Sequence, residues 1–293
     1  MTALPTAPVV VGADGSRRGL DAVEAAAAEA ALRHRPLRIV HALVSPVIDF
    51  AFAPGLTGSS LQALRDQADA IVREAALLAA KVAPEVTITA EVVNGGPGQV
   101  LRDESRTAGL IVVGNRGLGG FAELLIGSVA EQAAVHGSCP VLVLHGDRHG
   151  TGPVVVGVDG SAVSMRALEF AAEEAALRDA DLLALHAWTG DAATELNDTL
   201  PASSATGSDA GEEARVLAEC LAGIAPRYPD LTIHREVVRG SARRLLVERS
   251  ATAQLVVVGS RGHGGVTGAL LGSVSLHLIH HAACPIVVVR PAP

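Results

Sequence analysis

Glycine and serine residues with the spacing of a phosphate-binding loop occur in the first half of this chain. Gly114-x-x-Gly117 is followed, after nine further residues, by Gly127-Ser128. Glycine lets an anion approach backbone N–H groups without meeting a Cβ atom. The Gly-Ser pair falls near the start of an expected helix, where unpaired N–H groups, the helix dipole and a hydroxyl can hold negative charge. The pattern therefore predicts a site for a phosphate group.

The same pattern returns 145 residues later as Gly259-x-x-Gly262, nine residues and Gly272-Ser273. Self-similarity at a fixed offset is the signature of a repeated structural unit. The chain therefore contains two copies of one domain, and we expect each copy to carry its own loop.

An aspartate follows the first apolar run of each copy, as Asp14 and Asp159. In an open α/β sheet, ligands bind outside the carboxyl ends of the strands, where the connections leave on opposite faces. A carboxylate there can accept a hydrogen bond from a ribose hydroxyl or help to hold a metal-bound phosphate. Asp14 could instead cap the following helix, with Ser16 as a rival for that position.

Other charged and ring side chains support weaker hypotheses. Arg116 and Arg261 either add positive charge at the glycine turn or are solvated surface charges. His41 and His186 lie inside expected strands, where we expect structural hydrogen bonds and no catalysis. The residue after each histidine ends the second strand and is placed to offer backbone hydrogen bonds to a base.

The sequence lacks the motifs of several common catalytic sites. The single lysine, Lys81, lies in a helical pattern away from the glycine loops, which argues against a Walker A loop and Schiff-base chemistry. No serine lies in a Gly-x-Ser-x-Gly elbow. His277 and His281 have metal-ligand spacing, but Gln132 replaces His277 in the first copy and no acidic third ligand is evident, so we expect no zinc site.

Apolar runs and alanine-rich stretches alternate along each copy. Continuous runs of Val, Ile and Leu are typical of parallel strands covered on both faces. We expect a parallel sheet with helices on both sides in each half. The stretches 45–59 and 190–208 are expected to be irregular, and the second is polar enough to act as a lid. In the first copy the expected strands are 9–11, 37–43, 86–93, 110–113 and 141–144, and the expected helices are 17–32, 60–82, 97–107 and 122–136.

Length and composition narrow the class of protein. The chain has 293 residues, which fits two domains of ordinary size. A formal net charge of −8 argues against binding to nucleic acid. Three cysteines form no disulfide framework or zinc spacing, which favours buried thiols in the cytoplasm. The N-terminal residues lack the features of a signal peptide, and no apolar stretch reaches the length of a membrane span.

The two glycine motifs, the strand-one aspartates, the Gly-Ser-Val sequences and the Cys-Pro pairs together resemble the universal stress protein family in its tandem form. The resemblance covers nearly the whole chain, twice. It implies two open, parallel, five-stranded sheets of order 3-2-1-4-5, an adenine-nucleotide alpha-hydrolase-like α/β fold. It also implies ATP and Mg²⁺ in each domain and a regulatory role linked to stress or dormancy. The expected domains are 1–147 and 154–293, joined by the linker 148–153.

Both copies keep every motif glycine, so we expect both sites to be competent. Asn115 and Leu118 stand where the second copy has Ser260 and His263, so the affinities can differ. The nucleotide-binding residues expected in the first copy are Gly12, Ala13, Asp14, Ala42, Gly114, Arg116, Gly117, Leu118, Gly119, Gly120, Gly127, Ser128 and Val129. Those expected in the second copy are Gly157, Val158, Asp159, Ala187, Gly259, Arg261, Gly262, His263, Gly264, Gly265, Gly272, Ser273 and Val274.

An ATP-dependent regulatory switch is the leading hypothesis for function. The alternatives are a slow ATPase or nucleotidyl transferase and a nucleotide-free dimerisation scaffold. The missing base argues against the first alternative, and the intact glycine motifs argue against the second. We further expect the fifth strands of the two domains, which lie at sheet edges, to pair with one another. We also expect a homodimer and protein partners that the sequence does not identify.

Overall fold

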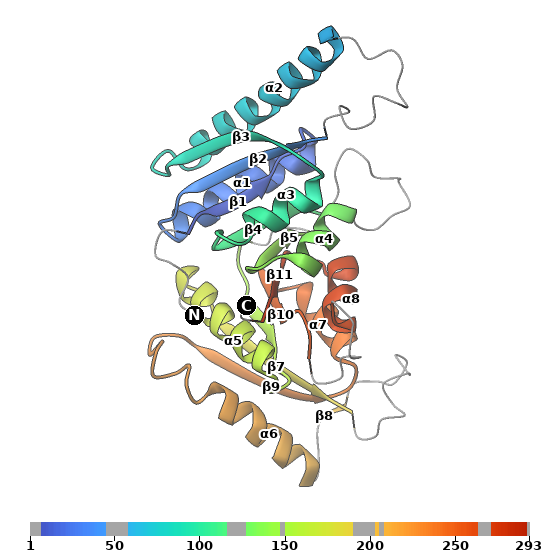
Figure 1. Ribbon diagram of the computed structural model, residues 1–293. Helices are drawn as coiled ribbons and strands as arrows, with labels where there is room; N and C mark the ends of the chain where they lie inside the picture. The colour runs from blue at the N-terminus through green and yellow to red at the C-terminus, as the bar shows by residue number, and fades with distance from the viewer. Residues whose placement is uncertain are drawn as a thin grey trace. The chain divides into compact units, whose positions relative to one another are not determined.

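The computed structural model describes residues 7–44, 58–115, 127–146, 150–189, 203–204, 208–262 and 271–291 (Figure 1). The chain divides into two compact units, Met1–Val141 and Leu142–Pro293. A division near the middle agrees with the internal repeat, and the more detailed boundary at residue 147 stays a prediction.

The first unit contains a parallel sheet in the order β3-β2-β1-β4 (Figure 1). Val9 pairs with Leu37 on one side and with Leu110 on the other. The central strands β1 and β4 have buried valine, leucine and isoleucine side chains, as expected for a sheet covered on both faces. The strands are β1 (Val9–Gly12), β2 (Leu37–Leu43), β3 (Ile88–Asn94) and β4 (Leu110–Gly114), and β5 (Val141–Leu144) begins at the unit boundary.

In the described part of this unit, four helices cover the sheet, α1 (Arg17–Leu32), α2 (Gly58–Val82), α3 (Pro97–Glu104) and α4 (Ser128–His136). The chain steps outward from β1 to β2 to β3 and then returns past β1 to β4. Since such crossovers are right-handed, the change of direction places α1 and α2 on one face and α3 and α4 on the other. The packing of α1 against α2 and of α3 against α4 agrees with this arrangement.

The second unit repeats the architecture with five parallel strands in the order β11-β10-β6-β7-β9. Numbered along this copy, that order is 5-4-1-2-3, so the expected topology is confirmed. The strands are β6 (Val154–Gly157), β7 (Leu182–Trp188), β9 (Ile233–Arg239), β10 (Leu255–Gly259) and β11 (Ile286–Val289). The helices are α5 (Ala162–Leu177), α6 (Ser208–Leu221), α7 (Ala242–Ser250) and α8 (Ser273–His281).

Several predicted boundaries differ from the structure. Helix α4 begins at Ser128 and not at residue 122, because Gly127 has extended backbone angles (φ −78°, ψ 139°). A two-residue strand, β8 (Ser203–Ser204), pairs antiparallel with β9 inside the stretch expected to be irregular. The remainder of the expected lid, 190–202 and 205–207, and most of 45–59 lie outside the described residues.

Among the described helices, none has the length and apolar character needed to cross a membrane.

Candidate functional site

A tight turn follows the first strand of the first unit and directs Asp14 toward the start of α1. Gly15 has φ +80°, which a residue with a Cβ atom rarely adopts. The Ser16 backbone N–H (2.9 Å) and hydroxyl (2.6 Å) donate to Asp14 Oδ1. Ser16 Oγ in turn accepts from the Gly19 N–H at 3.0 Å. Ser16 is therefore the N-cap of α1, and Asp14 holds the cap in place.

The second unit has the same turn. The Ser161 N–H donates to Asp159 Oδ1 at 2.9 Å, and Ser161 Oγ caps α5 by accepting from the Ser164 N–H at 3.2 Å. The equivalent left-handed glycine, Gly160, again has φ +80°. The sequence interpretation missed both left-handed glycines, although the repeated Asp-Gly-Ser sequence is a turn signal that could have identified them.

The strand-one aspartate of the second unit lies directly beside the glycine motif. A Cβ atom built on Gly262 would lie 2.1 Å from Asp159 Oδ2. The backbone of the motif therefore approaches the carboxylate as closely as only glycine permits. The structure thus brings together two site residues that are 103 positions apart in the sequence (262 minus 159).

The two parts of each motif meet at their base. The Gly127 N–H donates to the Asn115 carbonyl at 2.6 Å, and the Gly272 N–H donates to the Ser260 carbonyl at 2.7 Å. These two glycine N–H groups are therefore used in hydrogen bonds within the loop and are not available to a ligand. Directly after them, α4 and α8 begin without a side-chain cap, so their first-turn N–H groups, at Ser128 and Ser273, lie next to the loop.

The histidines at the end of the second strands brace the same edge of each sheet. The ring Nδ1 atoms of His41 and His186 each lie 2.7 Å from a carbonyl oxygen, that of Ala13 and Val158 respectively. Because a carbonyl only accepts, Nδ1 must carry the proton in both rings. Both rings therefore fix the turn after strand one, which agrees with the structural role expected for them.

The backbone of Ala42 points toward the crevice beyond β1. Val40 accepts from the Ala13 N–H on the β1 side, whereas Leu43 accepts from the Gly95 N–H on the β3 side. Peptide groups alternate in direction along a strand, so those of Ala42 face the β1 side. The pairing of β1 with β2 ends at Gly12 and Val40, so this edge passes the end of β1.

The second unit has the same arrangement at Ala187. Leu185 accepts from the Val158 N–H and Trp188 accepts from the Gly240 N–H, which places the peptide groups of Ala187 on the β6 side. Each unit therefore offers a backbone edge at the position expected for the base.

Positive charge gathers beside the loop of the second unit. Arg261 is exposed, and Arg290 directly follows β11. Burial and, to a smaller extent, the charge of Arg261 lower the pKa of Arg290. The sequence interpretation missed Arg290, because only the tertiary fold brings the end of the fifth strand next to the motif.

Two of the expected glycines differ in how closely they are packed. A Cβ atom at Gly12 would make ordinary contact with Leu101 at 3.5 Å, whereas one at Gly157 would lie 3.0 Å from Leu246 Cδ1. The described residues therefore do not require glycine at position 12. The expected site residues Arg116, Gly117, Leu118, Gly119 and Gly120, and His263, Gly264 and Gly265, lie outside the described part of the chain.

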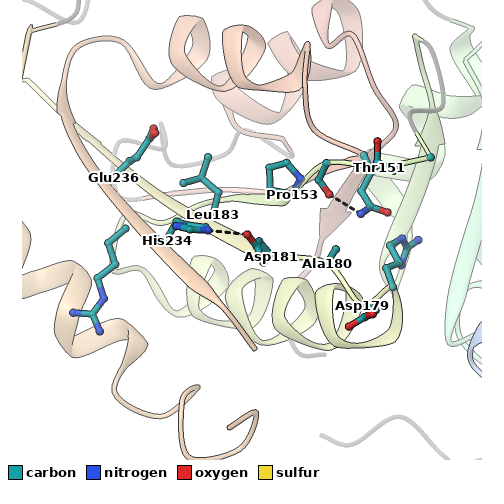
Figure 2. Close-up of a pocket in the computed structure, with 13 residues that line it drawn as sticks. Thr151, Pro153, Asp179, Ala180, Asp181, Leu183, His234 and Glu236 are labelled. Atoms are coloured by element: carbon teal, nitrogen blue, oxygen red, sulfur yellow. Dashed lines mark hydrogen bonds and ion pairs between the residues drawn. The ribbon is translucent and has the colours of Figure 1, made fainter. Parts of the chain in front are cut away.

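A cavity of about 830 Å³ lies at the opposite, amino-terminal edge of the second sheet (Figure 2). Pro153, Leu183, His234 and Gln254 line it, and the His234 ring contacts Asp181 at 2.8 Å. None of the expected site residues contributes to this cavity. Helix N-termini and glycine turns lie at the carboxyl edge, so we place the candidate anion site there.

The described residues contain no group of three His, Cys, Asp or Glu side chains that could hold a metal ion. On α8 the rings of His277 and His281 pack at a centroid distance of 4.4 Å.

Comparison with known proteins gives a consistent result. The family model described as universal stress protein family matches residues 6–145 and again 151–290. A universal stress protein of Mycolicibacterium smegmatis is 37% identical over 97% of each chain. One of Mycobacterium tuberculosis is 38% identical over 96% of each chain. The crystal structure of a universal stress protein from Archaeoglobus fulgidus has a TM-score of 0.70 at 19% identity, with 99% of each chain covered, and so supports the fold.

Proposed function

Because the chain belongs to the universal stress protein family, we propose that each of its two domains binds one ATP with Mg²⁺ and that occupancy of the sites acts as a regulatory switch. The observation that carries this proposal is the close approach of the Gly262 backbone to the Asp159 carboxylate. It joins the strand-one aspartate and the glycine motif at the edge where open α/β sheets bind ligands.

The phosphate groups would lie against the loop and the first turn of α4 or α8. The N–H groups at Ser128 and Ser273 and the positive ends of these helices favour negative charge. Arg261 adds a cation in the second site. The backbone edges at Ala42 and Ala187 would receive the adenine, since a base needs one donor and one acceptor on the same edge.

The single aspartate in each site fits Mg²⁺ that arrives with the nucleotide. Mg²⁺ is commonly held by one or two carboxylates together with substrate phosphates and water, and seldom by a cage made of protein ligands alone. Asp14 or Asp159 would supply that carboxylate or would accept from the ribose. When bound, the ion would neutralise part of the phosphate charge.

The proposed role is regulatory and not catalytic. The two histidines nearest to the sites have Nδ1 committed to the carbonyl oxygens of Ala13 and Val158. In the second unit Nε2 of His186 is also occupied, because it lies 2.8 Å from Glu213 Oε2. We therefore expect hydrolysis to be slow at most, and multiple turnovers per second that disappear in a site variant would instead favour the ATPase or nucleotidyl-transferase alternative.

Calorimetric titration of nucleotide-stripped protein with ATP and Mg²⁺ tests the proposal. We expect saturation near two ATP per chain and a loss of at least about 10-fold in affinity when Asp14→Ala and Asp159→Ala are combined, because charge-assisted contacts contribute roughly 1.5–3 kcal/mol. Thr107→Ala, at an exposed site in the first unit, serves as the control.

Absence of binding in stripped, folded protein would favour the nucleotide-free scaffold. Mass spectrometry of small molecules released from freshly purified protein would show which adenine nucleotide is carried. Light scattering of the full chain tests the expected homodimer. Partner proteins of the proposed switch should bind the chain differently in the presence and absence of ATP.

A further inference from the structure

An arginine outside the glycine motif reaches the motif in the first unit. Arg18 lies in the first turn of α1, and its Nη1 donates to Asn115 Oδ1 at 2.7 Å. The Asn115 carbonyl is the group that accepts from the Gly127 N–H at 2.6 Å. The guanidinium is therefore anchored on the residue where the two parts of the motif meet.

The Arg18 guanidinium has donors to spare for a ligand. Arginine carries five N–H donors in a planar fork, a geometry that suits phosphate oxygens. Within the described ranges, the contact with Asn115 is its one hydrogen bond, and it forms no ion pair. Arg18 is exposed whereas Asn115 is buried, so the anchored cation remains accessible to solvent.

The second unit has no equivalent charge at this point. Val163 takes the place of Arg18, and its Cγ1 would lie 3.0 Å from a Cβ atom built on Gly259. Ser260 takes the place of Asn115 and is fully buried, and among the described residues its hydroxyl has no hydrogen-bond partner. A valine side chain thus stands where the first unit has the anchored arginine.

The second arginine beside the loop of the second unit, Arg290, does not compensate for this difference, and Arg261 has its own counterpart in the first copy, Arg116. It follows β11, which pairs with β10 on the side away from β6. The crevice between strand one and strand four lies on the other side of β10. Arg18, by contrast, belongs to a helix that packs on both β1 and β4, the two strands that border the crevice of the first unit.

We propose that Arg18 is a phosphate-contacting, specificity-determining residue of the first site, which makes that site prefer ATP to AMP more strongly than the second site does. This inference rests on the proposed function. The second and third phosphates of ATP would add negative charge that the Arg18 guanidinium can contact. AMP has a single phosphate, so its binding would depend less on Arg18. The two domains of one chain would then respond differently to a mixture of adenine nucleotides.

The test uses the full chain with the second site blocked by Gly262→Val, since that side chain would collide with the Asp159 carboxylate. ATP with Mg²⁺ and AMP are titrated separately by calorimetry. We expect Arg18→Val to weaken ATP about 10-fold or more and AMP less than about 3-fold, as for loss of a charge-assisted hydrogen bond. Arg18→Lys should retain part of the preference.

The matched control is Arg17→Val, which removes the same charge from the neighbouring exposed position and should change either affinity less than about 2-fold. The same substitutions without Gly262→Val should weaken one of two ATP sites, which guards against a folding defect of the blocked chain.

Unchanged ATP affinity in Arg18→Val, or equal losses for ATP and AMP, would overturn the inference and leave the proposed function intact. Failure of the unsubstituted chain to bind any adenine nucleotide would overturn both.

Discussion

At the level of single residues, the site depends on close approaches that leave no room for side chains. The turn after strand one uses a left-handed glycine in each copy, at Gly15 and Gly160. The Asp159 carboxylate lies so close to the Gly262 backbone that a Cβ atom on residue 262 would collide with it. These contacts set the distance between the carboxylate and the loop, and a methyl group is enough to change that distance.

We predict that Gly262→Ala weakens ATP at the second site by about 10-fold or more while the fold survives. The new Cβ atom would lie 2.1 Å from Asp159 Oδ2, so the carboxylate must turn away from the loop. Moving the end of a side chain costs less free energy than moving the backbone. The substitution should therefore lower the ATP affinity more than the stability of the fold. Calorimetry measures the affinity, and circular dichroism checks the fold.

Gly211→Ala is the control for this variant, because a Cβ atom there meets nothing within 4 Å. The corresponding change in the first copy, Gly117→Ala, is predicted to act on the first site alone. Retention of full affinity by both motif variants would identify these glycines as ordinary turn residues.

At the level of elements, the two copies use different ion pairs around the third strand and the third helix of the repeat. In the first unit, Arg38 on β2 donates to both carboxylate oxygens of Glu104 (2.8 and 2.9 Å) and to Glu91 on β3 (3.0 Å). These contacts raise the pKa of Arg38 above its usual value. In the second unit the cation is on α7, where Arg249 donates to Glu236 at 2.9 Å, and Leu183 takes the place of Arg38.

We predict that Arg38→Leu destabilises the protein by about 1–3 kcal/mol, because the Glu104 side chain, 15% exposed, loses its bidentate partner. Adding Glu104→Arg should restore at least half of the loss, since it recreates the pairing of the second unit. Urea unfolding of the single and double variants measures the coupling.

Arg106→Ala provides the comparison, because its contact with Asp103 is exposed and should contribute under about 1 kcal/mol. Equal stability losses in Arg38→Leu with and without Glu104→Arg would show that the two arrangements are not interchangeable.

At the level of the whole molecule, each copy of the repeat has one buried cysteine just before its fifth strand. Cys139 and Cys284 precede β5 and β11 and are 8% and 0% exposed. Burial raises the pKa of each thiol from 9.0 to about 12. Both thiols therefore stay protonated in the folded chain at neutral pH.

We predict that these two thiols make stability fall as the pH rises from about 9 to about 12. The unfolded thiols ionise near pH 9 while the folded ones do not, so the unfolded state gains about 1 kcal/mol per thiol by pH 10. Chemical unfolding across this pH range measures the loss. The double variant Cys139→Ala and Cys284→Ala should show a flatter profile, and an unchanged profile would contradict the assignment.

The sequence by itself determined the repeat, the parallel topology and the identity of the motif. These features depend on local patterns, since continuous apolar runs make buried strands and a fixed offset makes two copies. The ends of α1 and β2 were predicted to the residue because a capping serine and polar turns delimit them. The start of α4 was predicted at residue 122, which is wrong, because the backbone of Gly127 is extended and the helix begins at Ser128.

Only the tertiary structure decided which side chains meet at the carboxyl edge of each sheet. Arg18 is 97 residues from Asn115, and no local pattern relates the two. Likewise, the contact of Asp159 with Gly262 and the position of Arg290 depend on strands one, four and five lying side by side. Such contacts arise from strand order and register, so the motif predicted a kind of ligand, while the fold determines which other residues lie beside the motif.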